Sequence, residues 1–136
     1  MSAMPPLTVV AGLIVRDGAL LLARRDERRD QPGLWELPGG KVEPGETQPQ
    51  ALRRELFEEL SLHARIGSFV ALHRRVLGER EILLYGWRVT HFRGELELHC
   101  HSECIWLPPP RALALPLAAA DAPLIQALIA QDAARR

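Results

Sequence analysis

Three glutamates near the middle of the chain have the type and spacing expected of a metal-binding cluster. Glu55, Glu58 and Glu59 stand at positions i, i+3 and i+4, so that on a helix they share one face. Clustered carboxylates repel one another unless a cation lies among them, and Mg²⁺ and related hard cations take oxygen ligands of this kind. The alternative is a solvated acidic face that Arg53 and Arg54 partly neutralise.

A helix beginning after Thr47 is predicted to position these carboxylates. Thr47 and Gln50 form a capping-box pattern, and Pro49 falls in the first turn, where backbone amides lack intrahelical partners. At 100° per residue the glutamates adjoin the apolar stripe of this helix. The stripe consists of Leu52, Leu56 and Leu60. The carboxylates are therefore expected at the edge of the buried face.

A glycine-rich loop precedes this helix. The stretch "PGGKVEPGE" contains Gly39, Gly40 and Lys41. Glycines let the backbone approach a ligand closely, and a loop that leads into a helix can place phosphate near backbone N–H groups. The spacing is not that of a Walker phosphate loop, so by itself the stretch indicates phosphate binding only weakly.

The remaining pattern predicts an α/β protein with a mixed sheet and helices on its faces. Residues 7–24 read as a β-hairpin, because two apolar runs flank the turn "RDG". Strands are also predicted over 64–76 and 81–92, joined by a turn at Gly78, and at the end of 94–107. A helix with Pro123 in its first turn is predicted to end the chain. One helix between strands and one at the end favour a covered sheet.

Composition narrows the class of protein. The chain has 136 residues, which fits a single domain over 1–136, and 47% of them are hydrophobic. Lys plus Arg equals Asp plus Glu at 17 each, which gives no support for binding a nucleic-acid polymer. Two cysteines make no disulfide framework, and neither a signal peptide nor a membrane span is evident. We therefore expect a cytoplasmic protein that does not bind membranes.

The glycine loop and the helix together resemble the Nudix box, G-x5-E-x7-R-E-U-x-E-E-x-G-U, where U is apolar. Gly40, Glu46 and the run from Arg54 to Leu62 match every defined position except one, where Ser61 replaces glycine. Nearly the whole chain is similar to MutT-like nucleoside triphosphate pyrophosphohydrolases, most of all to the bacterial CTP pyrophosphohydrolase subgroup. The resemblance implies a Nudix-type α/β/α sandwich.

The resemblance also implies roles for the box residues. Glu55, Glu58, Glu59 and the carbonyl of Gly39 match ligands of Mg²⁺ or Mn²⁺, and Glu55 matches the proposed base for the attacking water. Lys41 is expected to touch phosphate or to steer the base, unless it is a solvated lysine. Glu46 and Arg54 match an ion pair that braces the loop against the helix. Ser61, in a left-handed helix cap, is expected to cost about 1 kcal/mol of stability.

Three further residues match nucleotide-binding positions of the MutT-like enzymes, and two more are candidates for the wall of the base pocket. Arg25 and Arg80 match nucleotide contacts, with plain surface arginines as the alternative. Asp121 matches a residue that faces the base, where a carboxylate accepts from an exocyclic amino group; the alternative is an N-cap of the last helix. Trp35 and Leu37 either line the base pocket or pack in the core.

The segment "HCHSEC" (99–104) departs from the family pattern. Cys100 stands where MutT-like enzymes often carry an auxiliary glutamate, so that glutamate is either absent or replaced by the nearby Glu103. His99, Cys100, His101 and Cys104 would supply ligands for zinc, but neighbouring strand residues point to opposite faces. Scattered strand residues are therefore expected in place of a zinc site.

The function implied is Mg²⁺-dependent hydrolysis of a nucleoside triphosphate to the monophosphate and pyrophosphate. Cytosine nucleotides (CTP, dCTP or 5-hydroxy-dCTP) are the first candidates and 8-oxo-dGTP the second. The alternatives are a Nudix hydrolase of a nucleoside diphosphate derivative such as ADP-ribose, and a non-catalytic nucleotide-binding module. Either a monomer or a homodimer fits the sequence.

Overall fold

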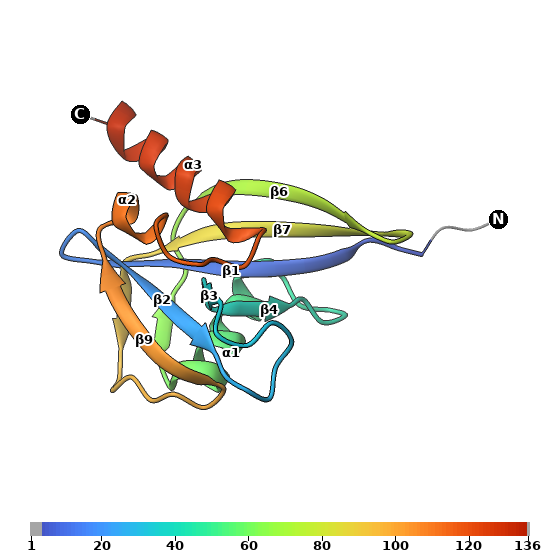
Figure 1. The fold of residues 1–136 in the computed structure, drawn as a ribbon, viewed down its shortest axis with the longest axis horizontal. Coiled ribbons are helices and arrows are strands. Elements are labelled where there is room, and N and C mark those ends of the chain that lie inside the picture. Colours follow the sequence, from blue (N-terminus) through green and yellow to red (C-terminus); the bar gives the residue numbers. More distant parts are fainter. Residues whose placement is uncertain (1–3, 136) are drawn as a thin grey trace.

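A computed structural model describes residues 4–135, and its centre is a mixed seven-stranded sheet (Figure 1). The central strand β1 pairs antiparallel with β2 and β4 and parallel with β7. Strand β3 and strand β9 both pair with β2, and β6 pairs with β7. The strands are β1 Leu7–Arg16, β2 Ala19–Arg25, β3 Trp35–Glu36, β4 Gly39–Lys41, β6 Phe69–Leu77, β7 Arg80–Val89 and β9 His101–Leu107.

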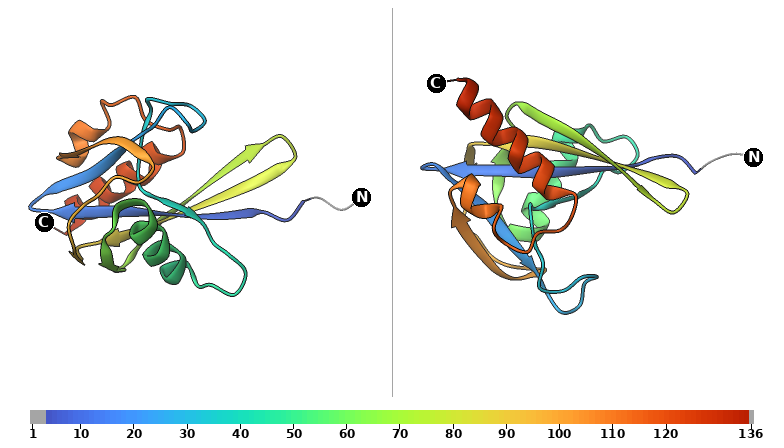
Figure 2. Two further views of the ribbon diagram at one scale, coloured as in Figure 1. Left: turned by 90° about the horizontal axis from the view of Figure 1, so that it is seen from below. Right: turned by 45° about the horizontal axis from the view of Figure 1, so that its top comes forward.

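Helices cover both faces of this sheet (Figure 2). Leu13 of β1 packs in one core with Leu124 and Leu128 of α3 (Asp121–Ala134), whereas Ile14 packs in another core with Leu52 of α1 (Gln48–Leu60). Successive strand side chains point to opposite faces, which explains the near-continuous apolar run of β1. The predicted α/β/α sandwich is confirmed. A short helix, α2 (Pro109–Ala112), lies before α3.

Two of the predicted strands are each divided in two. Instead of one strand over 64–76, there are β5 (His63–Arg65) and β6, and the chain also breaks between β7 and β8 (His91–Arg93). The amide of Gly67 donates to Arg88 O at the break, and β5 pairs with β8 in a separate two-stranded sheet. The separate sheet packs beside α1, since Ala64 and Phe92 contact the core that contains α1.

Helix α1 begins and ends as the sequence predicts. Thr47 caps it with a complete capping box, in which its side chain accepts from Gln50 N and its amide donates to the Gln50 side chain. The predicted stripe is fully buried and comprises Leu52, Leu56 and Leu60. Ser61 ends the helix in the left-handed conformation, with φ 59° and ψ 24°.

The strain at Ser61 gives a testable stability difference. Ser61→Gly is expected to be more stable than Ser61→Ala by about 1 kcal/mol, because only glycine adopts this conformation without a steric cost. Both variants lose the contact between Ser61 Oγ and His99 Nε2, at 2.7 Å, so their difference isolates the backbone effect. Urea denaturation measures it. Equal stabilities would show that the left-handed cap stores no strain.

No helix within residues 4–135 combines the length and the apolar character that crossing a membrane requires.

Candidate functional site

A cavity of about 340 Å³ lies beside strand β4 and brings together residues distant in sequence. Strand β2, the β3–β4 segment, strand β6 and the start of α3 all contribute to its wall. Its polar lining includes Arg25, Arg29, Glu36, Gly39, Gly40, Lys41, Arg75 and Asp121. The cavity thus joins the glycine loop to cationic side chains, the combination that a polyphosphate requires.

The three α1 glutamates differ in their exposure to solvent. The Glu58 side chain is 56% exposed, that of Glu55 is 16% exposed, and Glu59 is buried. Arg54 donates to Glu55 at 3.0 Å and to Glu58 at 3.3 Å, so it partly neutralises the cluster. The carboxylates therefore run from the helix surface into the protein, as their place beside the apolar stripe predicts.

Glu59 is the least satisfied of these carboxylates. Its Oε1 is buried and has no hydrogen-bond partner among residues 4–135. Burial, together with the neighbouring Glu55, raises the pKa of Glu59 to about 9. Leaving a buried polar oxygen without a partner costs about 1–3 kcal/mol. The arrangement is unfavourable unless a cation or a donor outside the chain satisfies the oxygen.

The two glycines of β4 allow close approach of its neighbours, Gly40 to α1 and Gly39 to β1. A Cβ atom at Gly40 would collide with the carboxylate of Glu55, and one at Gly39 would collide with Val10 O. No residue with a side chain fits at either position without displacing its neighbours. Gly40 therefore sets how closely β4 approaches α1, and Gly39 sets how closely β4 approaches β1.

The loop between β4 and α1 is braced by one ion pair. Arg54 donates to both carboxylate oxygens of Glu46, at 2.8 and 3.0 Å, and also to Lys41 O at 3.1 Å. Hydrogen bonds from Arg54 and from the amide of Glu43 lower the pKa of Glu46 to about 2. The predicted brace between loop and helix is confirmed.

A second charged network lies across the cavity and was not foreseen from the sequence. Buried Glu36 accepts from Arg25 at 2.7 Å and from Arg29 at 2.6 Å, and its Oε2 lies 2.8 Å from His101 Nε2. Burial acts to raise the pKa of Glu36, but the bond with His101 and the pairing with both arginines lower it to about 2. The network fixes both guanidinium groups at the cavity wall.

Asp121 has a different local role from the predicted N-cap. The N-cap position of α3 is Ala120, and Asp121 begins the helix without a side-chain capping bond. Its Oδ2 instead accepts from the amide of Leu37 at 3.0 Å. Burial raises the pKa of Asp121 to about 7. The N-cap interpretation is wrong, and Asp121 is a buried carboxyl at the cavity wall.

The other residues named from the sequence divide between the cavity and its surroundings. Leu37 and exposed Lys41 line the cavity, whereas Trp35 packs in the core beside α3 and is not among the lining residues. Arg80 donates to Pro5 O at 3.3 Å, away from the lining, and the β6 arginine that does line the cavity is Arg75. Arg75 lies opposite Ile82 in the β6–β7 ladder, and Ile82 lines the cavity as well, a pairing that the sequence does not reveal.

The structure shows which residue occupies the position of the auxiliary glutamate, Cys100 or Glu103. Glu103 is exposed and pairs with Arg24 at 2.7 Å, whereas Cys100 lies beside Glu59. Burial and the carboxylate of Glu59 raise the pKa of the Cys100 thiol to about 11. Cys100, and not Glu103, therefore occupies the place next to the α1 cluster.

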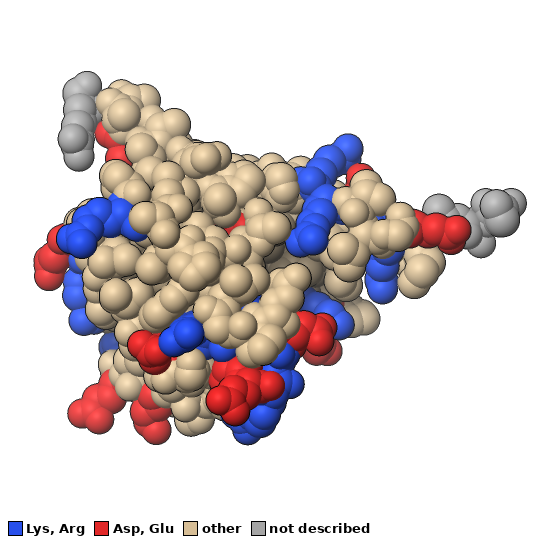
Figure 3. Space-filling view, in the orientation of Figure 1, with Lys and Arg blue, Asp and Glu red and all other residues tan. Residues whose placement is uncertain are grey.

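A larger cavity, of about 1080 Å³, lies between α1 and the β5–β8 sheet. Arginine, histidine and aromatic side chains line it, and the lining of neither cavity includes any of the three α1 glutamates. Figure 3 shows acidic and basic side chains adjoining one another on the face that it depicts. We take the smaller cavity as the candidate site, because it adjoins the glycine loop and the buried carboxyl groups.

The residues present fit a divalent cation. Three carboxylates lie within two turns of α1, Glu59 has an unsatisfied buried oxygen, and Gly40 of β4 leaves space beside Glu55. Oxygen donors of this kind are the ligands that hard divalent cations take. The group that could hold such an ion consists of Glu55, Glu58, Glu59 and the backbone carbonyl of Gly39.

Comparison with known proteins agrees with this geometry. The family model for the NUDIX domain matches residues 5–128. The chain is 51% identical over 132 residues to the CTP pyrophosphohydrolase of Escherichia coli, covering 97% of this chain and 98% of that protein. It is 40% identical over 106 residues to the putative 8-oxo-dGTP diphosphatase 2 of Mycobacterium tuberculosis, covering 73% and 71%.

Comparison of the fold with solved structures also finds Nudix-type relatives. The solution structure of the E. coli ORF135 protein has a TM-score of 0.91 at 51% identity, covering 97% of this chain and 94% of that one. The crystal structure of a MutT protein from Methanosarcina mazei Go1 has a TM-score of 0.84 at 26% identity, covering 94% and 96%. The box, the sandwich and these matches together show that the chain belongs to the Nudix hydrolase family.

Proposed function

We propose that the protein hydrolyses a nucleoside triphosphate to the monophosphate and pyrophosphate with Mg²⁺ bound by its α1 carboxylates. The observation that carries the proposal is the buried Glu59 oxygen without a partner, beside a cavity that contains glycine and arginine residues. The 51% identity to a CTP pyrophosphohydrolase over nearly the full length of both chains supports the choice of substrate class. Residues 1–136 would act as one Nudix domain whose partner is the nucleotide.

Different residues of the chain are proposed to bind the metal and to activate the attacking water. Glu55, Glu58, Glu59 and the Gly39 carbonyl would hold Mg²⁺ or Mn²⁺, which when bound neutralises charge on the polyphosphate and lowers the pKa of water. Glu55 is proposed to accept the proton of the attacking water. Arg54 keeps that carboxylate oriented through its 3.0 Å bond.

The basic side chains of the cavity wall are suited to the phosphates. Arg25 and Arg29 are held rigidly by Glu36, so little conformational entropy is lost when they bind an anion. Lys41 is exposed at the mouth of the cavity and is free to turn toward a phosphate. Arg75 on β6 adds a further positive charge to the wall.

Base selection is assigned to Asp121. In its ionised form the carboxylate accepts from an exocyclic amino group such as cytosine N4, and Leu37 supplies an apolar wall beside it. Cytosine nucleotides are therefore the first candidates. Similarity to a putative 8-oxo-dGTP diphosphatase makes an oxidised purine nucleotide the second.

A turnover panel with Mg²⁺ tests the proposal. CTP, dCTP, 5-hydroxy-dCTP, 8-oxo-dGTP, dGTP and ADP-ribose would be compared, with products identified by chromatography. Release of pyrophosphate from a cytosine nucleotide is the expected result. Activity on ADP-ribose alone would contradict the substrate class, and no turnover of any compound would contradict the proposed enzyme.

Asp121→Asn is expected to lower kcat/KM for the cytosine substrate by about 10- to 100-fold, the equivalent of 1–3 kcal/mol for one lost base contact. Because the pKa of Asp121 is raised to about 7, ionisation should increase cytosine preference in the native protein as pH rises through 7. Asp132→Asn is the matched control, since Asp132 lies on the same helix and pairs with Arg88. An equal loss on every nucleotide would show that Asp121 does not read the base.

A further inference from the structure

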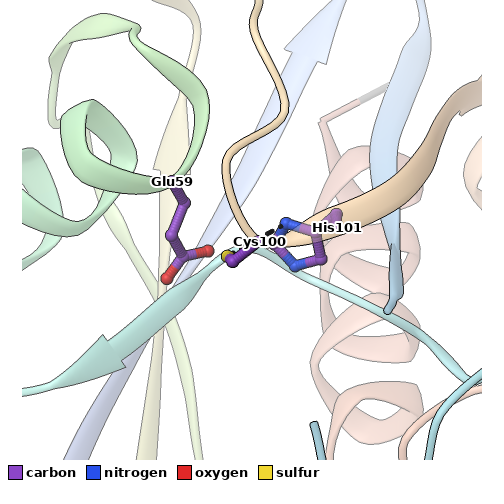
Figure 4. A group of neighbouring side chains, drawn as sticks. All are labelled: Glu59, Cys100 and His101. Carbon is purple, nitrogen blue, oxygen red and sulfur yellow. Dashed lines mark hydrogen bonds between the residues drawn. The ribbon is translucent and has the colours of Figure 1, made fainter. Parts of the chain in front are cut away.

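Three potential metal ligands of different chemistry meet beside the proposed catalytic cluster. Glu59 comes from α1, Cys100 from the bend before β9, and His101 is the first residue of β9. One donor atom of each residue lies within 4.8 Å of the other two (Figure 4). The set differs from the four histidine and cysteine residues of "HCHSEC", since it takes two of them and adds a distant glutamate.

An irregularity in the sheet brings Cys100 and His101 together. Regular strand alternation would place neighbouring side chains on opposite faces. Cys100, however, lies in a bend outside β9, and the β2–β9 register shifts between Arg24 and Arg25, opposite this point. Cys100 Sγ therefore lies 3.5 Å from His101 Nδ1. The expectation that these residues scatter over two faces is wrong for this pair.

The hydrogen bonding of His101 leaves Nδ1 available. Its Nε2 lies 2.8 Å from Glu36 Oε2, and Glu36 is an acceptor, because its two oxygens also accept hydrogen bonds from Arg25 and Arg29. Nε2 must therefore carry the proton, although Arg29 Nη1 also lies 3.2 Å from it. The lone pair then falls on Nδ1, which faces Cys100. A carboxylate that accepts from the far nitrogen is the usual support of a histidine that binds a metal.

Glu59 supplies an independent sign of a missing ligand. The residue is 8% exposed, and its Oε1 is buried without a partner among residues 4–135. Figure 4 shows its carboxylate directed toward Cys100. A cation placed between the three side chains would satisfy this oxygen.

We propose that Glu59, Cys100 and His101 bind a divalent cation of intermediate softness, such as Zn²⁺ or Co²⁺. Bonds of about 2.0–2.3 Å put tetrahedral donor atoms roughly 3.3–3.8 Å apart, so the present spacing requires only small side-chain rotations. Thiolate and imidazole ligands favour such ions over Mg²⁺. The Cys100 thiol, and the Glu59 carboxyl where it is protonated, release their protons to solvent when the metal binds. Three protein ligands leave a fourth position open to water or phosphate.

Glu59 belongs both to this proposed site and to the proposed Mg²⁺ site, so metal binding at one affects the other. An ion of intermediate softness bound here would take Glu59 away from the oxygen cluster proposed to hold Mg²⁺. Cys100, at the position of the auxiliary glutamate, thus changes which metal the neighbourhood prefers. The metal-binding inference itself does not depend on the proposed function, because coordination is measured without turnover.

Titration of the metal-free, full-length protein with Co²⁺ under argon tests the proposal. The native protein is expected to show a near-ultraviolet thiolate-to-cobalt charge-transfer band that saturates at one equivalent and disappears when Zn²⁺ is added. Cys100→Ser is expected to lose the band. Cys104→Ser is the matched control and is expected to keep it, since Cys104 is the other free, half-buried cysteine of the segment.

A conservative variant gives a second measurement if Cys100→Ser folds poorly. Glu59→Gln is expected to weaken Co²⁺ binding by about tenfold or more while the charge-transfer band remains, because the thiolate is still present. Far-ultraviolet circular dichroism checks the fold of each variant. The proposal is overturned if the native protein shows no band, if Cys100→Ser keeps it, if Cys104→Ser loses it, or if Glu59→Gln binds Co²⁺ unchanged.

Discussion

Glu59→Gln is expected to lower kcat for the preferred nucleotide by roughly 10³-fold, about 4 kcal/mol of transition-state stabilisation, while making the metal-free protein more stable. The kcat and the stability of the metal-free protein change in opposite directions because both depend on the buried, ionisable carboxyl group of Glu59. The buried oxygen that has no partner in the chain is the one proposed to bind Mg²⁺. An amide fills the same space but neither ionises nor holds the metal as a carboxylate does.

The stability effect should depend on pH in a defined direction. The pKa of Glu59 is raised from 4.5 to about 9 in the folded protein, so the native state binds more protons than the unfolded chain between these values. The stability contribution of Glu59 is therefore complete below about 4.5 and is lost progressively as pH rises toward 9. Thermal unfolding of the metal-free native protein should show this loss, and Glu59→Gln should remove it.

Glu58→Gln is the matched control for this experiment. Glu58 belongs to the same proposed ligand set, but its side chain is 56% exposed. Its replacement should therefore lower turnover without removing the pH dependence of stability. If Glu59→Gln kept full turnover, the proposed metal site would be wrong. If the pH dependence survived in that variant, another group would be responsible for it.

The parts of the site that depend on one local pattern could be predicted from the sequence. The spacing of Glu55, Glu58 and Glu59 along a capped helix determines which side they share, and the structure buries them in order from Glu58 to Glu59. The near-continuous apolar run of β1 likewise predicts a strand buried on both faces, and its side chains alternate between the cores of α1 and α3. Such features require only the geometry of one element.

The parts that depend on contact between distant elements could not be predicted in this way. Glu36 meets His101 across 65 positions of sequence, and Asp121 meets Leu37 across 84. Cys100 approaches Glu59 because of a bend and a register shift, neither of which leaves a period in the sequence. A solitary charged residue in a strand does not reveal which other strand supplies its partner.

Glu36→Gln is expected to destabilise the protein by about 3 kcal/mol at pH 7, because breaking a buried ion network leaves charges without compensation. Arg25 and Arg29 approach the two oxygens of this carboxylate at 2.7 and 2.6 Å. Without the negative charge, the two guanidinium groups repel each other at the cavity wall. Urea denaturation measures the loss, and weaker nucleotide binding should accompany it.

Solvent exposure determines how much an ion pair contributes to stability. The pair of Arg24 and Glu103 is a suitable control, because its N–O distance equals that of Arg25 and Glu36. Glu103 lies 2.7 Å from Arg24, but both side chains are largely exposed, so Glu103→Gln should cost at most about 0.5 kcal/mol. The pKa of Glu36 is lowered from 4.5 to about 2, so its stabilisation is complete above 4.5 and is lost as pH falls toward 2. The difference in free energy of unfolding between the native protein and Glu36→Gln should therefore decrease as pH falls from 4.5 to about 2. Equal losses for the two variants at pH 7 would show that the Glu36 network contributes no more than a surface pair, and that another interaction holds the arginines at the cavity.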